Sequence, residues 1–207
     1  MNLLVVGANG KLGHALVRQA CDLGHKVTAL VHHTPTQSMH CARVLQGDAR
    51  DPEFIDTAVA TQQAIIDTVG TRRPFLKTTL ETDVARNLIA AMQRHKVRRI
   101  LAVSSIGVGD SIVNTPALYR ALIPSFFRGA MPDKAGMESQ LRSSALDWTI
   151  VRPAGLTNGP ITNAVQIVTP QSMRLVRRIS RADVAAFILQ HLDDPRSFAQ
   201  ILGIATQ

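Results

Sequence analysis

Short apolar runs alternate with amphipathic stretches along most of the 207-residue chain. The apolar runs are typical of buried strands, and the stretches between them carry apolar residues at helical spacing. In the first such stretch, Leu12, Ala15, Leu16 and Ala20 fall on one face of a helix. The pattern predicts strands at 3–7, 27–31, 42–47, 64–69, 99–104 and 149–151, and helices at 11–23, 52–59 and 75–95.

Two further helices are predicted nearer the C-terminus. "DKAGMESQL" contains the first turn of one, and "SRAD" opens the other, with Ser180 placed to cap it and Asp183 three residues later. Strands that alternate with helices indicate a parallel sheet covered on both faces. We therefore predict an α/β protein with a doubly wound parallel sheet, the Rossmann fold, as a single domain over residues 1–207 with a short C-terminal substrate-facing region.

The segment 106–131 is a long stretch without a regular pattern, rich in Pro, Gly and Phe. It follows the fifth predicted strand. Long loops in compact domains are usually functional, and in this fold ligands bind at the carboxyl ends of the strands. We expect this segment to border a ligand, with an apolar wall supplied by Leu122, Phe126, Phe127 and Met131.

The stretch "VVGANGKLG", residues 5–13, joins the first strand to the first helix. Gly7 permits a tight turn, Gly10 lets the backbone approach a diphosphate, and Gly13 lets helix and strand pack closely. The helix N-terminus adds free N–H groups and a positive dipole end. At the start of a βαβ pattern this turn predicts a dinucleotide site, although its spacing is G-x-x-G-x-x-G rather than G-x-G-x-x-G.

The end of the second strand bears on which dinucleotide is bound. An acidic residue there binds the ribose 2′-hydroxyl and favours NAD. This chain has "ALVHHT" instead, and His32 and His33 can both hydrogen-bond a 2′-phosphate. We predict NADP as the cofactor, with NAD as the alternative. The competing interpretation is that both histidines are solvated turn residues.

Amino-acid composition limits the classes of partner that the protein can bind. The formal charge is +8, which serves an anionic cofactor as well as nucleic acid or acidic lipid. Only 4% of residues are aromatic, so stacking platforms are lacking and we expect no nucleic-acid partner. The apolar runs are too short for a leader peptide or a membrane span. Cys21 and Cys41 are too few for a disulfide framework and lack metal-ligand spacing, so we expect a reduced, cytoplasmic setting and no metal.

Longer stretches carry a more specific resemblance. They include "VGTRRPF", "DVARNLIAAMQRHKVRRILAVSSIGV", "ESQLRSSALDWTIVRPAGLTNGP" and "ISRADVAAFIL". With the glycine turn they span nearly the whole chain. The chain resembles the atypical short-chain dehydrogenases/reductases, in particular the NAD(P)H-binding group that includes biliverdin-IX-beta reductase, also called flavin reductase.

That resemblance implies roles for particular residues. It places Asn9 to Leu12 around the diphosphate, Asp48 and Ala49 along the adenine, Ser105 beside the nicotinamide, and Pro153 against its face. Together with the glycine turn and the two histidines argued from the sequence itself, the candidate cofactor-binding residues are Gly7, Asn9, Gly10, Lys11, Leu12, Gly13, His32, His33, Asp48, Ala49, Gly70, Thr71, Arg72, Ser104 and Pro153, and the catalytic candidates are Ser105 and Lys134.

Several of these residues have simpler interpretations. Asp48 can cap the turn at a strand end, and Arg72 can be a surface charge. The Ser105 hydroxyl can bond backbone in its own loop. Lys134 can be a surface lysine, with Glu138 one turn on as a pairing partner.

The chain also departs from its larger superfamily. Its Y-x-x-x-K motif is missing: if Lys134 fills the lysine position, Ala130 occupies that of the tyrosine. Alcohol–ketone chemistry that needs a phenolic acid is therefore not supported. A conjugated acceptor can take hydride directly, with its proton from solvent. At the position of His32 the group often has an arginine, which binds the 2′-phosphate of NADP. The prediction of NADP therefore depends on a histidine in place of that arginine.

Two functions from different classes follow. The first is an NAD(P)H-dependent reductase that transfers hydride to a flavin, a quinone or another planar conjugated acceptor, acting as a monomer or weak homo-oligomer. The second is a non-catalytic NAD(P)-binding redox-sensing regulator or assembly factor. An epimerase or sugar reductase ranks behind both, because the short C-terminal region leaves little room for a substrate domain.

Overall fold

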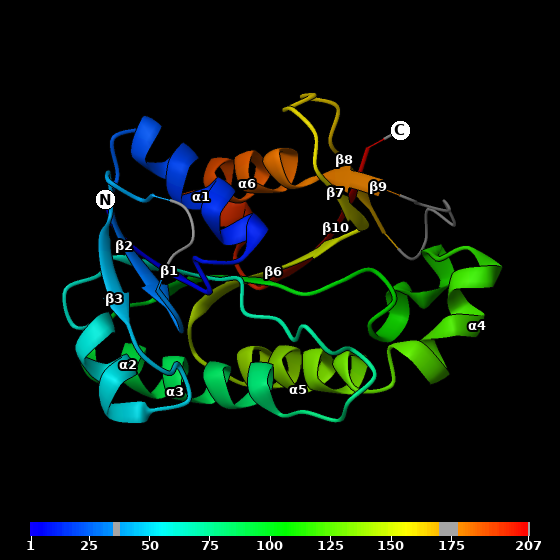
Figure 1. Ribbon diagram of the computed structural model, residues 1–207, viewed down its shortest axis with the longest axis horizontal. Helices are drawn as coiled ribbons and strands as arrows, with labels where there is room; N and C mark the ends of the chain where they lie inside the picture. The colour runs from blue at the N-terminus through cyan, green and yellow to red at the C-terminus, as the bar shows by residue number, and fades with distance from the viewer. Residues whose placement is uncertain (35–37, 170–177, 207) are drawn as a thin grey trace.

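The computed structural model describes residues 1–34, 38–169 and 178–206, with the backbone alone at 119 and 122–125. Within these residues an eight-stranded sheet runs through the middle of the molecule in the order β3-β2-β1-β4-β5-β6-β10-β8 (Figure 1). Its strands are β1 (Asn2–Val6), β2 (Lys26–Val31), β3 (Arg43–Gln46), β4 (Ala64–Asp67), β5 (Arg99–Val103), β6 (Asp147–Pro153), β8 (Gln166–Val168) and β10 (Gln200–Ala205).

Neighbouring strands of this sheet pair in parallel, except β8, which runs antiparallel to β10. The chain moves outward from β1 to β2 and β3, and then returns to place β4 on the other side of β1. This reversal is the defining feature of a doubly wound sheet. The predicted Rossmann fold is confirmed.

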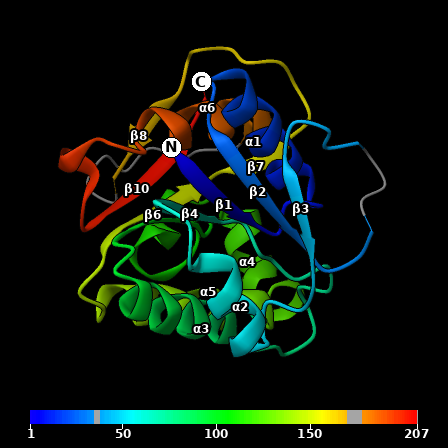
Figure 2. The ribbon, with the colours of Figure 1, turned by 90° about the vertical axis from the view of Figure 1, so that its left-hand side faces the viewer.

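Two helical layers cover the sheet (Figures 1 and 2). One layer holds α1 (Lys11–Asp22) and α6 (Arg181–Gln190), and the other holds α2 (Pro52–Val59), α3 (Leu80–His95) and α5 (Ala130–Arg142). Alternate side chains of β1 enter opposite cores: Leu3 and Val5 belong to the first, and Leu4 and Val6 to the second. No helix in the described part of the chain is long and apolar enough to cross a bilayer.

The helix predicted at 75–95 begins later, at Leu80. The cap residue Thr79 makes no side-chain cap hydrogen bond, and Thr78 Oγ1 accepts only the first N–H, that of Leu80, at 3.0 Å. Instead the backbone N–H groups of Glu81 and Thr82 donate to the Asp133 carboxylate at 3.0 and 2.9 Å. Asp133 lies in the first turn of α5. A contact between two helices therefore fixes this start, which the local pattern could not indicate.

The second half of the chain holds elements that the pattern did not predict. The segment 106–131, expected to be irregular, contains a short 3₁₀ helix (Gly109–Asn114) and α4 (Ala117–Phe126). β7 (Gly155–Thr157) and β9 (Arg178–Ser180) form a separate two-stranded parallel sheet, and a 3₁₀ turn (Pro195–Ser197) precedes β10. The predicted cap of α6 is confirmed, because the Asp183 N–H donates to Ser180 Oγ at 2.9 Å.

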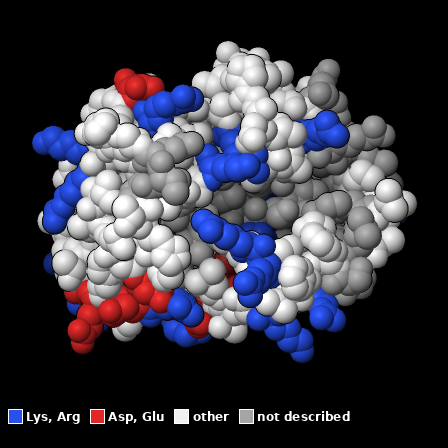
Figure 3. Space-filling view, viewed as in Figure 1, with Lys and Arg blue, Asp and Glu red and all other residues white. Residues whose placement is uncertain are grey.

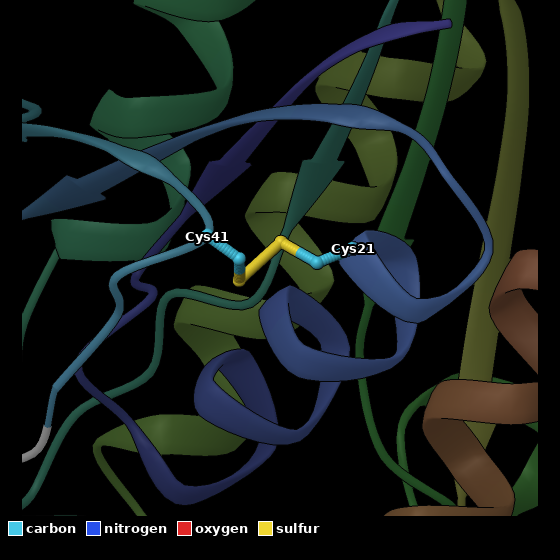
Figure 4. The surroundings of a disulfide bond; sticks show 2 residues. All are labelled: Cys21 and Cys41. Carbon is cyan, nitrogen blue, oxygen red and sulfur yellow. A yellow bond between two sulfur atoms is a disulfide. The ribbon is translucent and has the colours of Figure 1, made fainter.

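Cys21 and Cys41 form a disulfide (Figure 4). Their Cα atoms lie 6.1 Å apart, and the bond joins the last turn of α1 to the segment that leads into β3. The expectation of a reduced pair is therefore wrong. Sequence spacing alone did not show that the segment after β2 returns to the end of α1.

Candidate functional site

A cleft of about 1040 Å³ opens where β1, β4, β5 and β6 end. It lies at the point where the strand order reverses, which is where doubly wound sheets bind ligands. Among the predicted site residues, the cleft brings together Asn9, Gly10, Lys11, Leu12, Gly13, Gly70, Thr71, Arg72, Ser104, Ser105, Lys134 and Pro153. Gly7, His32, His33, Asp48 and Ala49 do not line it.

The glycine turn has the geometry of an anion site. Gly7 has a φ of 77°, a conformation that side chains rarely adopt. A Cβ on Gly13 would lie 2.4 Å from the Gly7 carbonyl oxygen, so the helix packs against the turn without room for a methyl group. No side chain caps α1 at Gly10, and no acidic residue lies in its first turn. Its N–H groups and positive dipole end are therefore available to phosphate oxygens.

Asp67 ends β4 beneath the cleft and is fully buried. Its Oδ1 accepts the Val69 N–H at 3.0 Å. Burial raises the pKa of this carboxyl to about 7. The next residue, Thr68, lines the cleft and donates its hydroxyl to the Val6 carbonyl at 2.8 Å. These bonds join the end of β4 to β1 and fix the loop that carries Gly70.

The two serines that follow β5 differ in their partners. The Ser105 hydroxyl donates to the Ile106 carbonyl at 3.0 Å, which is the simpler of its two predicted roles. The Ser104 hydroxyl is buried and has no hydrogen-bond partner among the residues that the structure describes. A buried hydroxyl without a partner is costly, and this one lines the cleft, where a ligand could satisfy it.

Lys134 lies at the cleft wall, with Nζ 2.7 Å from Glu81 Oε2. The Glu81 side chain is only 1% exposed, and burial raises the pKa of this carboxyl even though the Lys134 charge opposes that shift. The expected pairing of Lys134 with Glu138 is wrong. Glu138 instead holds Arg152 of β6, with Arg152 Nη2 2.6 Å from Glu138 Oε2, because that face of α5 packs on the sheet.

The histidines lie at the end of β2, next to the glycine turn. Asn9 Nδ2 donates to the His33 carbonyl at 3.5 Å, and nitrogen atoms of the His32 and His33 rings lie 2.9 Å apart. Asp48 Oδ2 lies 3.9 Å from His32 Nε2. The Asp48 carboxylate is hydrogen-bonded by Arg50, and these hydrogen bonds lower its pKa to about 2. Asp48 Oδ1 accepts the Arg50 N–H at 2.9 Å and so caps its own turn, and its contact with adenine stays a prediction.

An apolar wall closes the other end of the cleft. Phe127 contributes to it as predicted, together with Ile106, Pro116 and Leu156. Phe126 is 51% exposed and does not line the cleft, and its ring packs against those of Phe75 and Phe127 at centroid distances of 6.4 and 5.0 Å. Met131 does not line it either, and the side chain of Leu122 lies outside the described residues.

The comparison with known proteins agrees with this geometry. The sequence profile of the NAD(P)H-binding family matches residues 7–195, from the glycine turn to the start of the 3₁₀ turn that follows α6. The chain belongs to the NAD(P)H-binding family.

The proteins similar to this NAD(P)H-binding protein carry names from different functional classes. ChuY of Escherichia coli O157:H7, named an anaerobillin reductase, has a TM-score of 0.82 and 26% identity, and the match covers 100% of this chain and 97% of that one. YhfK of Bacillus subtilis, named an uncharacterized sugar epimerase, is 31% identical over 94% of this chain and 89% of its own length.

The photosystem II assembly factor Ycf39 of Trieres chinensis is 28% identical over 95% of this chain. The chain spans only 61% of the length of that relative. The remaining part of that relative lies outside the match to this chain.

The residues of the cleft fit a dinucleotide. Three observations support this fit independently of the family match. There is no room for a Cβ at Gly13, the N-terminus of α1 is uncapped, and the Ser104 hydroxyl has no partner among the described residues. Sequence reasoning missed Glu81, Thr68 and Arg181. Nothing in the local pattern pairs Glu81 with Lys134, whereas Arg181 follows the predicted cap residue Ser180 and could have been placed at the helix start.

Proposed function

We propose that this protein is an NAD(P)H-dependent reductase that transfers hydride to a planar conjugated acceptor such as a flavin or a quinone. The observation that carries the proposal is the composition of the cleft: Ser104, unpartnered among the described residues, and half-buried Lys134 lie in the same cleft as an apolar wall built from Ile106, Phe127 and Leu156. A flat apolar slot suits an aromatic ring system. The ChuY likeness over the whole chain supports a reductase.

In this proposal the chain's own residues bind, orient and exclude water. The glycine turn and α1 hold the diphosphate, and Lys11 and Arg72 add positive charge there. Ser104 donates a hydrogen bond to the nicotinamide carboxamide, and Ser105 accepts one, since its own proton is used on Ile106. The reduced nicotinamide supplies the hydride. Lys134, held by Glu81, donates to the hydroxyls of the adjoining ribose.

The chemistry needs no phenolic acid. Ala130, which occupies the position of the missing tyrosine, is buried and offers no proton. A conjugated acceptor accepts hydride at one end and can take its proton from water at the other. The short C-terminal region, through β7 and the start of α6, completes the acceptor side of the cleft in this proposal. A cytoplasmic location and a monomer or weak homo-oligomer stay predictions.

The experiment that tests the function is direct. Purified protein is mixed with NADPH or NADH and with FMN, a naphthoquinone or a linear tetrapyrrole, and the absorbance of the reduced cofactor is followed. We expect consumption with at least one acceptor. The Gly13→Ala variant, whose cofactor site is disturbed, is the control, because a contaminating reductase would remain active in it.

We also propose NADP rather than NAD as the cofactor. His32 lies beside His33 and the glycine turn, where a 2′-phosphate of an extended adenosine would lie, and Arg50 neutralises the nearby Asp48. Replacing His32 by Ala should weaken NADPH binding several-fold and leave NADH binding unchanged, as measured by fluorescence titration. An equal loss for both cofactors would contradict this assignment.

A second function is favoured by a specific observation. The Ycf39 relatives are named assembly factors, and the likeness to one of them covers 95% of this chain. In that case the protein binds NAD(P)H and senses its redox state without turnover. Tight binding of NADPH with no consumption in the presence of any acceptor would favour this second function over the reductase.

A further inference from the structure

The charged side chains of the cleft are all basic. Among the described residues that line it, the ionisable ones are Lys11, His14, Arg72, Lys134 and Arg181, and none is Asp or Glu. Figure 3 shows Lys and Arg side chains beside the recess in the middle of this face, whereas Asp and Glu are most prominent at the lower left and form a smaller group at the upper edge. The cofactor phosphates account for the cations near the glycine turn, and Glu81 neutralises Lys134. Arg181 has no such explanation.

Arg181 is oriented but not neutralised. It is the first residue of α6, and its Nη1 donates to Asn158 Oδ1 at 2.7 Å. Asn158 directly follows β7, and Gly155 and Leu156 of β7 also line the cleft. An amide oxygen carries no net charge, so this bond holds the guanidinium beside the end of β7 without cancelling its charge. No carboxylate among the described residues pairs with it.

The nearest acidic residue along α6 is occupied elsewhere. Asp183 Oδ1 accepts the Thr162 N–H at 2.7 Å, and Asp183 Oδ2 accepts the Thr162 hydroxyl at 2.9 Å. These bonds, with the Ser180 cap, anchor the start of α6 to the chain that follows β7. The Arg181 backbone is therefore held in place. Its half-buried side chain extends from this fixed backbone and can contact a ligand in the cleft.

We propose that Arg181 binds an acidic oxygen group, a carboxylate or a phosphate, on the acceptor, so that the substrate class is a planar conjugated molecule bearing such a group. The inference rests on the proposed reductase function. A guanidinium matches the paired oxygens of either group with two parallel hydrogen bonds. Leu156 and Phe127 then contact the ring system while Arg181 holds the acidic substituent.

Matched flavins test this assignment. FMN and riboflavin share one ring system and ribityl chain and differ by a terminal phosphate, and the 5′-O-carboxymethyl ether of riboflavin carries a carboxylate in place of that phosphate. We would measure kcat/KM for the three with NADPH, in the natural protein and in Arg181→Gln. Arg178→Gln is the control, because Arg178 is an exposed arginine on β9 that does not line the cleft.

We expect Arg181→Gln to lower kcat/KM for the acidic flavins about tenfold to a hundredfold and to leave riboflavin unchanged. The larger loss identifies whether phosphate or carboxylate is preferred. Arg181→Lys should restore part of the loss, and Arg178→Gln should change nothing. NADPH affinity, from quenching of its fluorescence, should be the same in all variants.

Three results would overturn the inference. An equal loss for riboflavin and the acidic flavins would show that Arg181 does not read the acidic group. A loss of NADPH affinity in Arg181→Gln would assign the residue to the cofactor phosphates, and an effect of Arg178→Gln as large as that of Arg181→Gln would show a general charge effect.

Equilibrium binding separates this inference from the function on which it rests. If no flavin is reduced, binding of the three flavins to the NADP⁺ complex is measured by flavin fluorescence. Selective loss of the acidic flavins in Arg181→Gln would then support the site while the reductase function fails. Equal binding of all three would overturn the inference alone, and no binding of any would overturn both.

Discussion

At the scale of single residues, the sharpest constraint is the absence of a side chain at Gly13. A Cβ there would lie 2.4 Å from the Gly7 oxygen and 2.7 Å from the Ala8 Cα, both backbone atoms that can move only with the turn itself. Gly13→Ala should therefore cost about 1–3 kcal/mol in the free energy of unfolding and weaken NADPH binding at least tenfold. Urea unfolding and cofactor titration measure the two effects.

Gly159→Ala is the matched control, because its Cβ would have only an ordinary contact, 3.5 Å from the Ser180 Cβ. This variant should bind NADPH as the natural protein does. If Gly13→Ala also binds normally, the turn does not hold the diphosphate.

The glycines could be predicted at this scale because their role is local. Gly7, Gly10 and Gly13 lie within one turn, so their spacing alone indicates their conformation. The pairing of Lys134 with Glu81 joins residues 53 apart in sequence, and the lack of a partner for Ser104 depends on every neighbour around it. Contacts of this kind follow from the packing of elements, which the periodicity of the chain does not specify.

At the scale of elements, the disulfide fixes the end of α1 to the segment before β3. The cysteines are 20 residues apart in sequence, and closing a loop of that length stabilises a fold by about 3 kcal/mol. A dithiol reductant should therefore lower the urea midpoint of the natural protein. The double variant Cys21→Ser, Cys41→Ser should start at that lower midpoint and not respond to the reductant.

Thiol titration in denaturant is the accompanying measurement. We expect no reactive thiol before reduction and both cysteines afterwards. A natural protein with two reactive thiols at the outset, or a midpoint that the reductant does not change, would contradict a stabilising bond between Cys21 and Cys41.

The elements differ in how well the sequence pattern predicts them. β1, β2, β4, β5 and β6 were predicted to within a few residues because buried parallel strands are largely apolar. β3 was also predicted, although it is mostly exposed and has the weaker pattern RVLQ. β7, β8 and β9 have three residues each, too few for a periodicity to appear. The long segment after β5 looked irregular because Pro116, Pro124 and several glycines interrupt it, yet α4 begins directly after Pro116 and includes Pro124.

At the scale of the whole molecule, charge is arranged in two layers around the cleft. Basic side chains line its surface, and two carboxyls, Asp67 and Glu81, are buried beneath. Burial raises the pKa of both, so each opposes folding when it ionises. Lys134 pairs with Glu81, but Asp67 has the Val69 N–H as its partner and, within the described part of the chain, no cation in hydrogen-bond contact. Asp67 should therefore dominate the dependence of stability on pH near neutrality.

The sign of that dependence follows from its two pKa values. In the unfolded chain Asp67 titrates near 3.8, whereas in the folded protein its pKa is about 7. Between these values the folded protein keeps a proton that the unfolded chain has released, so the free energy of unfolding falls as pH rises. Asp67→Asn keeps an oxygen for the Val69 N–H and cannot ionise. Its stability relative to the natural protein should rise by about 3 kcal/mol between about pH 5 and about pH 8.

Urea unfolding of both proteins at the two pH values measures this difference, and Asp48→Asn is the matched control. The pKa of Asp48 is lowered to about 2 by Arg50, so this carboxyl is ionised in both states above about pH 5. The stability of Asp48→Asn relative to the natural protein should therefore be the same at both pH values. If the Asp67→Asn difference is also flat, then Asp67 ionises freely in the folded protein, and water must reach the end of β4 beneath the cleft.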